Sequence, residues 1–461
     1  MICALFSQPL LSARMLNYIW LGLIVSAVLI GGCTGHLKDL ADKSFEMAET
    51  SVMKIALPLV GIMALWLGIM RLAERAGLVA LLARALRPVM RFLFPEVPFD
   101  HPAMGSMLMN IAANMLGLGN AATPLGLRAM KDLESLNPRP GVATNAMCTF
   151  LAINTSSVQI IPVTAIAILA AAKSSNPTAI VGTSIMATSC AAISAVLMAK
   201  FLSKLRVFRP PAAVGAPAAK RSVAKPSDAG EEVVREAATI QPLQWWGRVL
   251  LALFGMFFVY LFIRLAFPAT LGMALPPEAA RETVFVRIVN AVSLISIPLL
   301  LSIFPLYALL RRVKVYEEFV EGAKEGFGVS LSIIPYLVAI LVAIGMFRAA
   351  GGIDLLSRIL RPVMVALHYP PDLLPMVFMR PLSGSGTLGV FSELVEHFGP
   401  DSLISRTAGT IYGSTETTFY VLAVYFGSVG IKKTRHALLA GLSADLVGVI
   451  ASVIVCRLVF G

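Results

Sequence analysis

Charged residues are scarce in this sequence: Asp, Glu, Lys and Arg supply 14% of its 461 residues, whereas hydrophobic residues supply 57%. Soluble domains carry about 25% charged residues, so this composition excludes an ordinary soluble protein and indicates a protein of the lipid bilayer. Long alternations of polar and apolar residues, which mark membrane β-strands, are missing as well. The membrane-spanning segments are therefore predicted to be α-helices.

Motifs of metal, disulfide and nucleotide chemistry are also missing. The five histidines and five cysteines are scattered, and the sequence contains no HExxH, CxxC or P-loop lysine motif. We therefore expect no metal site, no disulfide framework, no cofactor and no ATP-driven step. The cysteines lie mostly in apolar runs and are predicted to be small membrane-buried residues. They are Cys3, Cys33, Cys148, Cys190 and Cys456.

Positive charge is in excess, with a formal net charge of +12, a value that can indicate nucleic-acid binding. The basic residues, however, lie at the ends of apolar runs and in loops, without a basic domain around them. Membrane topology explains them better, because cytoplasmic loops are enriched in Lys and Arg. No nucleic-acid partner is expected.

Apolar runs long enough to cross about 30 Å of hydrocarbon occur throughout the chain. Two further runs, near 141–172 and 402–426, are interrupted by polar residues and predict discontinuous helices. The uninterrupted runs lie near 16–33, 52–72, 178–200, 245–268, 284–310, 329–347 and 437–459.

One stretch of the sequence occurs twice. Ala76–Met90 (AGLVALLARALRPVM) and Ala350–Met364 (AGGIDLLSRILRPVM) are identical at ten of fifteen positions, at a constant offset of 274. In both copies an apolar run of membrane-spanning length precedes the stretch, and a segment rich in Gly, Ser, Thr and Asn follows it. The chain is therefore predicted to consist of two related halves, with the function located where they meet.

The distribution of Lys and Arg predicts that these halves are inverted with respect to the membrane. The loop His36–Glu49 should lie outside, and the repeated stretch 76–90 should lie on the inner surface, where guanidinium groups meet lipid phosphates. The apolar segment His101–Leu116 is too short to cross, and a break from Gly117 to Pro124 follows it, so it predicts a re-entrant hairpin that enters from the cytoplasmic side. Pro371–Phe398 predicts a second hairpin that enters from the outside. The inner-surface arginines are Arg71, Arg75, Arg84, Arg87 and Arg91.

The predicted domains follow from this repeat. The first membrane half covers 1–206, with a domain around the repeated stretch roughly at 50–160, and the second covers 241–461, with the matching domain roughly at 328–430. Residues 207–240, rich in Pro and Ala with mixed charges, predict a flexible cytoplasmic linker. At the N-terminus, Met15 is an alternative start, and Leu29–Cys33 is similar to a lipoprotein cleavage box; an ordinary first helix is favoured.

Four polar stretches interrupt the apolar segments at matching places of the two halves, namely 110–123, 154–159, 380–387 and 414–418. Broken helices and hairpin tips expose backbone N–H and C=O groups that can bind a solute in secondary transporters. Structural packing of hydroxyl groups between membrane helices is the alternative explanation. The candidate solute-binding residues are Asn110, Asn114, Asn120, Thr123, Asn154, Thr155, Ser156, Gln159, Arg380, Ser383, Ser385, Thr387, Thr415, Glu416 and Thr417.

Arg380 and Glu416 are the two charged candidates inside these apolar segments. Burying either charge alone costs at least a few kcal/mol, so each needs a partner or a water-filled cavity. In the functional interpretation Arg380 holds an anionic group and Glu416 binds a cation or proton. In the structural interpretation the two form a fixed salt bridge.

An intramembrane enzyme is the first rival to a transporter. Gly384-Ser385-Gly386 is similar to a nucleophile turn, but a nucleophilic serine needs a nearby base. The nearest histidines in the sequence, His368 and His397, fall at predicted outer-surface ends. We therefore do not expect an enzyme.

The polar motifs resemble a known family. NMLGLGNAATPLGLRAM at Asn114–Met130, with NYIWLGLIV from Asn17, resembles spore maturation protein A. MRPLSGSGTLGVF at Met379–Phe391 and YGSTETTFYVLAVYFG at Tyr412–Gly427 resemble spore maturation protein B. The whole chain looks like a fusion of the two, each with a nucleoside-recognition or gate domain that is also found in concentrative nucleoside transporters and ferrous iron transport protein B.

The resemblance implies a multi-pass inner-membrane protein that is associated, in spore formers, with dehydration of the spore core. Two functions remain open. The first is a secondary transporter or permease of a small solute, nucleoside-like only by analogy, with a coupling cation or proton. The second is a non-transporting membrane scaffold in envelope or spore-cortex maturation. The predicted fold is an all-α integral membrane protein with two inverted-topology repeats, re-entrant hairpins and discontinuous helices.

Overall fold

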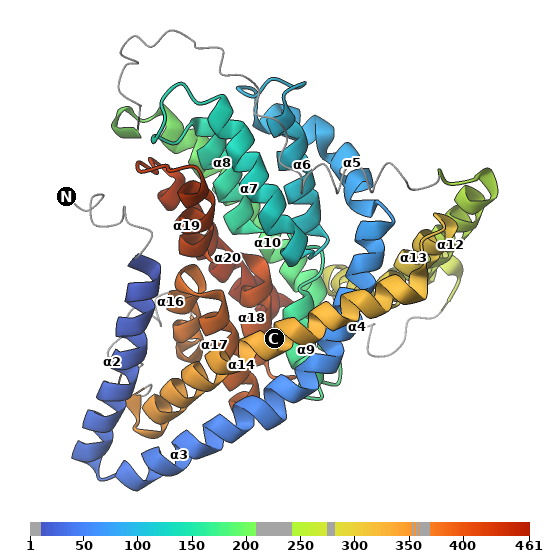
Figure 1. The fold of residues 1–461 in the computed structure, drawn as a ribbon. Coiled ribbons are helices and arrows are strands. Elements are labelled where there is room, and N and C mark those ends of the chain that lie inside the picture. Colours follow the sequence, from blue (N-terminus) through green and yellow to red (C-terminus); the bar gives the residue numbers. More distant parts are fainter. Residues whose placement is uncertain (1–10, 209–241, 274–281, 353–354, 356–357, 359–368) are drawn as a thin grey trace.

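The computed structural model describes residues 11–208, 242–273, 282–352, 355, 358 and 369–461 (Figure 1). The described residues form helices and contain no β-strand beyond an isolated bridge between Val142 and Lys433. Six of these helices are long and apolar enough to cross a membrane. The prediction of an all-α membrane protein is confirmed. The six span Leu37–Arg75, Pro177–Lys204, Trp245–Ala266, Val284–Leu310, Val315–Ala349 and Ala437–Phe460.

The first half runs from a long pair of helices into a hairpin, a broken helix and a final long helix. Its elements are α2 (Leu11–Thr34), α3 (Leu37–Thr50), the π-helical turn η1 (Ser51–Ala56), α4 (Leu57–Arg75), α5 (Leu78–Leu93), α6 (Pro102–Met115), α7 (Gly119–Ser135), α8 (Asn145–Ser156), α9 (Val163–Ala171), the turn η2 (Pro177–Ala179), α10 (Ile180–Lys204) and the turn η3 (Arg206–Phe208).

The second half presents the same order of long helix, hairpin, broken helix and final helix. Its elements are α12 (Trp245–Ala266), the turn η4 (Pro268–Leu271), α13 (Val284–Leu310), α14 (Val315–Ala349), the turn η5 (Pro371–Leu373), α16 (Leu374–Leu382), α17 (Gly384–Phe398), α18 (Leu403–Ser414), α19 (Thr418–Ser428) and α20 (Ala437–Phe460). The repeat itself remains a prediction. The second copy of the repeated stretch, 350–364, and the linker 207–240 lie largely outside the described residues.

The expectation that His36–Glu49 forms a loop is wrong. Residues Leu37–Arg75 form one continuous helix, in which α3 passes through η1 into α4. The charged residues of α3 occupy its exposed face, whereas Leu40 and Met47 are buried. Met47 packs so closely on α14 that a Cβ added to Gly345 would come within 2.5 Å of its Cγ. This amphipathic pattern makes α3 a helix despite its loop-like charge.

Helices α4 and α14 cross closely and lie side by side in Figure 1. A Cβ added to Gly326 would lie 2.7 Å from the Ala64 Cα, so only glycine allows this approach. Arg71 contacts Glu318 at 2.9 Å and Glu325 at 2.5 Å. Arg75 also pairs with Glu318, at 3.3 Å. Two of the five arginines assigned to lipid phosphates therefore pair with carboxylates of the other half instead.

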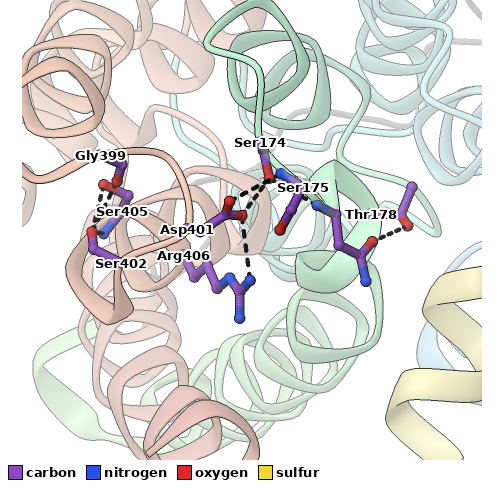
Figure 2. A network of polar contacts seen from close by, with 9 residues as sticks. Ser174, Ser175, Thr178, Gly399, Asp401, Ser402, Ser405 and Arg406 are labelled. Atoms are coloured by element: carbon purple, nitrogen blue, oxygen red, sulfur yellow. Dashed lines mark hydrogen bonds and ion pairs between the residues drawn. The ribbon is translucent and has the colours of Figure 1, made fainter.

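The two halves also join through loops. Asp401, in the α17–α18 loop, accepts hydrogen bonds from Ser174 Oγ at 2.7 Å and the Ser175 N–H at 2.9 Å in the α9–α10 loop (Figure 2). The loop after the hairpin of the first half, α7–α8, likewise meets the loop after the broken helix of the second half, α19–α20. Here the Ala143 N–H donates to the Lys433 carbonyl at 3.0 Å. In Figure 1 α19 reaches the upper end of the bundle beside α8, whereas α9 lies towards the lower end.

Candidate functional site

Two helices are broken at equivalent points. The first break separates α8 from α9, and Ser157 there adopts a left-handed conformation with φ of 33°. The second separates α18 from α19, where Thr415 is extended. Pro162 at the first break lacks an N–H, and the Ser and Thr hydroxyls around both breaks compete with helical hydrogen bonds. The structure thus contains the two discontinuous helices predicted from the sequence.

The two breaks contact each other across the halves. The Glu416 N–H donates to the Thr155 carbonyl at 2.6 Å, so backbone of one break is bonded to backbone of the other. Gln159 Nε2 also donates to Glu416 Oε1, at 3.5 Å. Groups that a continuous helix would bond internally are therefore satisfied by the opposite half.

Each hairpin tip packs on the break of its own half. At the α6–α7 tip, Met115 accepts a hydrogen bond from the Ile160 N–H at 3.0 Å. At the α16–α17 tip, a Cβ added to Gly384 would lie 3.2 Å from Thr417 Oγ1. Together with the bond between the breaks, these contacts connect the four predicted polar stretches into one continuous assembly. The hairpins are observed as helical hairpins; their re-entry into the membrane remains a prediction.

The asparagines of the first half form a polar cluster. Asn114 Nδ2 donates to Asn154 Oδ1 at 2.9 Å, and Tyr425 of α19 donates its hydroxyl to the same oxygen at 3.4 Å. Asn110, fully buried, donates through Nδ2 to the Ala122 carbonyl at 2.7 Å. Asn110 thus supports the hairpin backbone, whereas Asn114 and Asn154 connect tip and break. The Asn120 side chain lies outside the described residues.

Several candidate hydroxyls have structural partners. Ser156 donates to the Ile153 carbonyl at 2.8 Å, and Thr387 donates to the Ser383 carbonyl at 2.6 Å. Ser383 caps α17 by accepting from the Gly386 N–H at 3.0 Å, and its hydroxyl lies 3.3 Å from that of Ser385. The hydroxyls of Ser156, Ser383 and Thr387 are therefore satisfied by backbone of their own helices.

Other candidate residues have polar atoms without a hydrogen-bond partner or are partly exposed. Thr155 and Thr417 are buried, and neither Oγ1 atom has a hydrogen-bond partner among the described residues. Thr415 is buried as well, whereas Thr123 on α7 is half-buried. Asn114, Gln159, Ser385 and Glu416 are only half-buried. The junction thus combines buried hydroxyls with polar side chains that are partly exposed.

Arg380 and Glu416 do not form the salt bridge considered from the sequence. Arg380 is 2% exposed, and its guanidinium lies 4.9 Å from the centre of the Tyr412 ring. Within the described part of the chain no ion pair connects it to Glu416, and its Nε has no hydrogen-bond partner. Ring stacking supplies part of the compensation for burying this charge.

Sequence reasoning missed Asp445, a carboxylate in the middle of α20. It is 5% exposed and accepts one hydrogen bond, from Thr418 Oγ1 at 2.5 Å. Helix α20 contacts α16, α18 and α19, so Asp445 belongs to the same junction as Arg380 and Glu416. A lone carboxylate inside a membrane-spanning run was the signal that could have identified it.

Helix termini add partial charges to this junction. Helices α6, α8, α16 and α18 end there, and α7, α9, α17 and α19 begin there. Helix C-termini favour cations and helix N-termini favour anions. The junction thus brings together two carboxylates, one guanidinium and both kinds of helix end.

Two of the described cysteines are buried inside the protein and two lie on its surface. All four that the structure describes are free thiols. Cys148 and Cys456 are buried, whereas Cys33 and Cys190 are exposed on the surface of the protein.

A separate cavity of about 280 Å³ lies at the α7–α8 loop. Its lining includes Glu96, Arg139, Asn145 and Arg435 but none of the four polar stretches. This cavity is distinct from the junction of helix breaks.

The long apolar helices and the polar junction between two similar halves define a multi-pass helical membrane protein. Comparison with known proteins gives the family. The family described as "Gate: Nucleoside recognition" matches residues 56–173 and 330–432. Spore maturation protein B of Bacillus subtilis (strain 168) is 48% identical over 175 residues, which cover 38% of this chain and 98% of that protein.

Spore maturation protein A of the same organism is 43% identical over 187 residues, which cover 41% of this chain and 95% of that protein. The chain therefore belongs to the family of spore maturation proteins A and B. Two relatives that each cover about 40% of the chain agree with a fused arrangement of A and B. No solved structure matches the chain.

Proposed function

We propose that this protein is a secondary transporter or channel-like permease of the inner (cytoplasmic) membrane. Its solute site is the junction at which the two helix breaks and the two hairpin tips meet. The proposal depends above all on one observation: the Glu416 N–H of one half bonds the Thr155 carbonyl of the other, at 2.6 Å. Backbone that leaves its helix at membrane depth is tolerated where it is buried in protein or lines a cavity.

The exchange of loop contacts between the halves supports an inverted arrangement. In each contact, the loop that follows a hairpin in one half meets the loop that follows a broken helix in the other half. Such an exchange results naturally from an approximate two-fold axis in the membrane plane, which is the architecture of many secondary transporters. A solute site on this axis is reachable from either side when the two halves move relative to each other.

The charges at the junction favour a polar solute. Glu416 and Gln159 are half-buried and adjacent, whereas Arg380 is buried against Tyr412. A solute with hydroxyl and amide groups can pair with these side chains and with the ends of the broken helices. A nucleoside fits this description, and the name of the matching family supports testing nucleosides first.

The test combines ligand screening with transport. Purified protein is screened by thermal shift against nucleosides, organic anions and metal ions, because a ligand of the folded state raises the apparent stability. Hits are then measured for uptake into proteoliposomes. We expect Glu416→Gln to lower uptake at least tenfold at unchanged protein abundance and apparent melting temperature.

Glu396→Gln is the matched control, because Glu396 on α17 pairs with Lys54 at an exposed position outside the junction. It should keep wild-type uptake. If Glu416→Gln and Arg380→Ala both transport like wild type, the junction is not the solute site. If no compound is transported by the wild-type protein, the scaffold function is favoured instead.

A further inference from the structure

The immediate surroundings of Asp445 are unusual for a buried carboxylate. Thr418 Oγ1 donates to its Oδ2 at 2.5 Å, while Oδ1 has no hydrogen-bond partner among the described residues. An ionised carboxylate inside a membrane protein is costly unless a counter-charge or several hydrogen bonds compensate it. One short hydrogen bond, even with the Thr415 hydroxyl nearby, does not compensate a carboxylate that is 5% exposed.

The shape of α20 brings oxygen atoms towards this carboxylate. Gly441 and Gly448 precede and follow Asp445 on α20 by one turn, on the same face of the helix. A Cβ on Gly448 would come within 2.9 Å of Thr415 Cγ2, and a Cβ on Gly441 within 2.8 Å of Thr418 Cγ2. The glycines therefore let the second helix break lie directly against α20.

A second unpartnered oxygen faces the same place. The position of a Cβ on Gly441 lies 3.2 Å from Thr418 Oγ1 and 3.3 Å from Thr155 Oγ1. Thr155 is fully buried, and its Oγ1 has no hydrogen-bond partner in the described part of the chain. Threonine oxygens from both breaks thus lie beside Gly441, and Thr418 connects them to Asp445 on α20.

With Asp445 ionised, the charges around these oxygens sum to one negative charge. Arg380 and Glu416 act on Asp445 electrostatically with opposite signs, and no ion pair within the described residues connects either of them to it. One carboxylate therefore remains uncompensated. The C-terminal end of α18 adds partial negative charge, because no backbone N–H caps it at Thr415.

We propose that Asp445, Thr418 and Thr155 form a binding site for one monovalent metal cation, with Na⁺ as the probe ion. All the side-chain ligands are oxygens, which hard cations prefer. A proton on Asp445 would neutralise the carboxylate but leave Thr155 Oγ1 unpartnered, whereas a cation can accept lone pairs from both residues. The site joins both halves through the two breaks, so its occupancy would fix their contact. Its role as a coupling site rests on the proposed transport function; the binding itself does not.

Ion binding can be tested without any transport measurement. The apparent melting temperature of the full-length protein in detergent is measured at fixed pH and ionic strength, in NaCl, KCl or choline chloride. We expect a saturable rise of a few degrees in NaCl for the wild type. Asp445→Asn should abolish this rise, because the charge is removed while the side-chain shape is kept. Thr155→Val and Gly441→Ala should shift its midpoint to at least tenfold higher NaCl.

Asp401→Asn is the control, since this carboxylate lies in the α17–α18 loop, and it should keep the wild-type response to Na⁺. An equal rise in choline chloride, or a full Na⁺ response in Asp445→Asn, would overturn the proposal. So would a wild-type stability that depends on pH but not on Na⁺, which would assign a proton. If Asp445→Asn does not fold, Thr155→Val decides. A Na⁺ response in a protein that transports no solute would support this site while contradicting the proposed function.

Discussion

The pKa of the Asp401 carboxyl is determined by the hydrogen bonds that it accepts. Burial raises the pKa of Asp401, but hydrogen bonds from Ser174, the Ser175 backbone and Arg406 outweigh it and lower the pKa to about 2. Figure 2 shows these donors converging on the carboxylate from both halves. The ionised form is therefore the one that joins the α9–α10 and α17–α18 loops.

Asp401→Asn should lower the free energy of unfolding by about 1 kcal/mol at neutral pH, a modest value because the side chain is partly exposed. A carboxyl whose pKa falls on folding stabilises above its unfolded pKa, near 3.8, and loses this contribution as the pH falls towards about 2. Denaturant unfolding in detergent at several pH values measures the difference. A wild-type advantage that grows below pH 4 would contradict this assignment.

The residue scale also shows what sequence alone could identify. Arg380 and Glu416 were identifiable because charges inside apolar runs are rare, and Asp445 carried the same signal in the last apolar run. The partners were not identifiable. Contacts such as that between Gln159 and Glu416, at 3.5 Å, depend on how segments far apart in the sequence are placed, and no local pattern encodes that placement.

At the scale of helices, glycine determines how closely α4 and α14 approach. Gly326→Ala should destabilise the protein by about 1–3 kcal/mol, because its Cβ would lie 2.7 Å from backbone atoms of Met63 and Ala64, which cannot rotate away. Gly328→Ala on the same helix is the matched control, since no atom lies within 4 Å of its added Cβ. Thermal unfolding of both variants in detergent measures the effect. Equal stabilities would show that the two helices can separate at no cost.

The hairpins and helix breaks were easier to predict from the sequence than helix α3, because they carry local signals. The hairpins and breaks carry local signals, namely Gly117 with φ of 75° and the Ser and Thr residues around the breaks, and the sequence predicted all four. Helix α3 carries no such signal. Its many charges are typical of a loop, and the burial of Leu40 and Met47 against neighbouring helices makes its helical form favourable.

At the scale of the whole molecule, inversion of the two halves predicts which loops face which side of the membrane. The loop bearing Lys432 should lie inside, because Lys432, Lys433 and Arg435 form a basic cluster and such clusters are enriched in cytoplasmic loops. The loop bearing Ser175 should lie outside. Both positions are exposed. Each contacts a loop of the other half, so the two positions report on both halves together.

The measurement is cysteine accessibility in intact cells, in a background without the five native cysteines. Ser175→Cys should react with a membrane-impermeant maleimide in intact cells, whereas Lys432→Cys should react only after lysis. Normal expression of both variants is the control for folding. Labelling of both cysteines from one side would place the two loop contacts on the same face. The halves would then be parallel, and a solute site shared on an in-plane axis would be ruled out, because only inversion brings both breaks to the same depth from opposite directions.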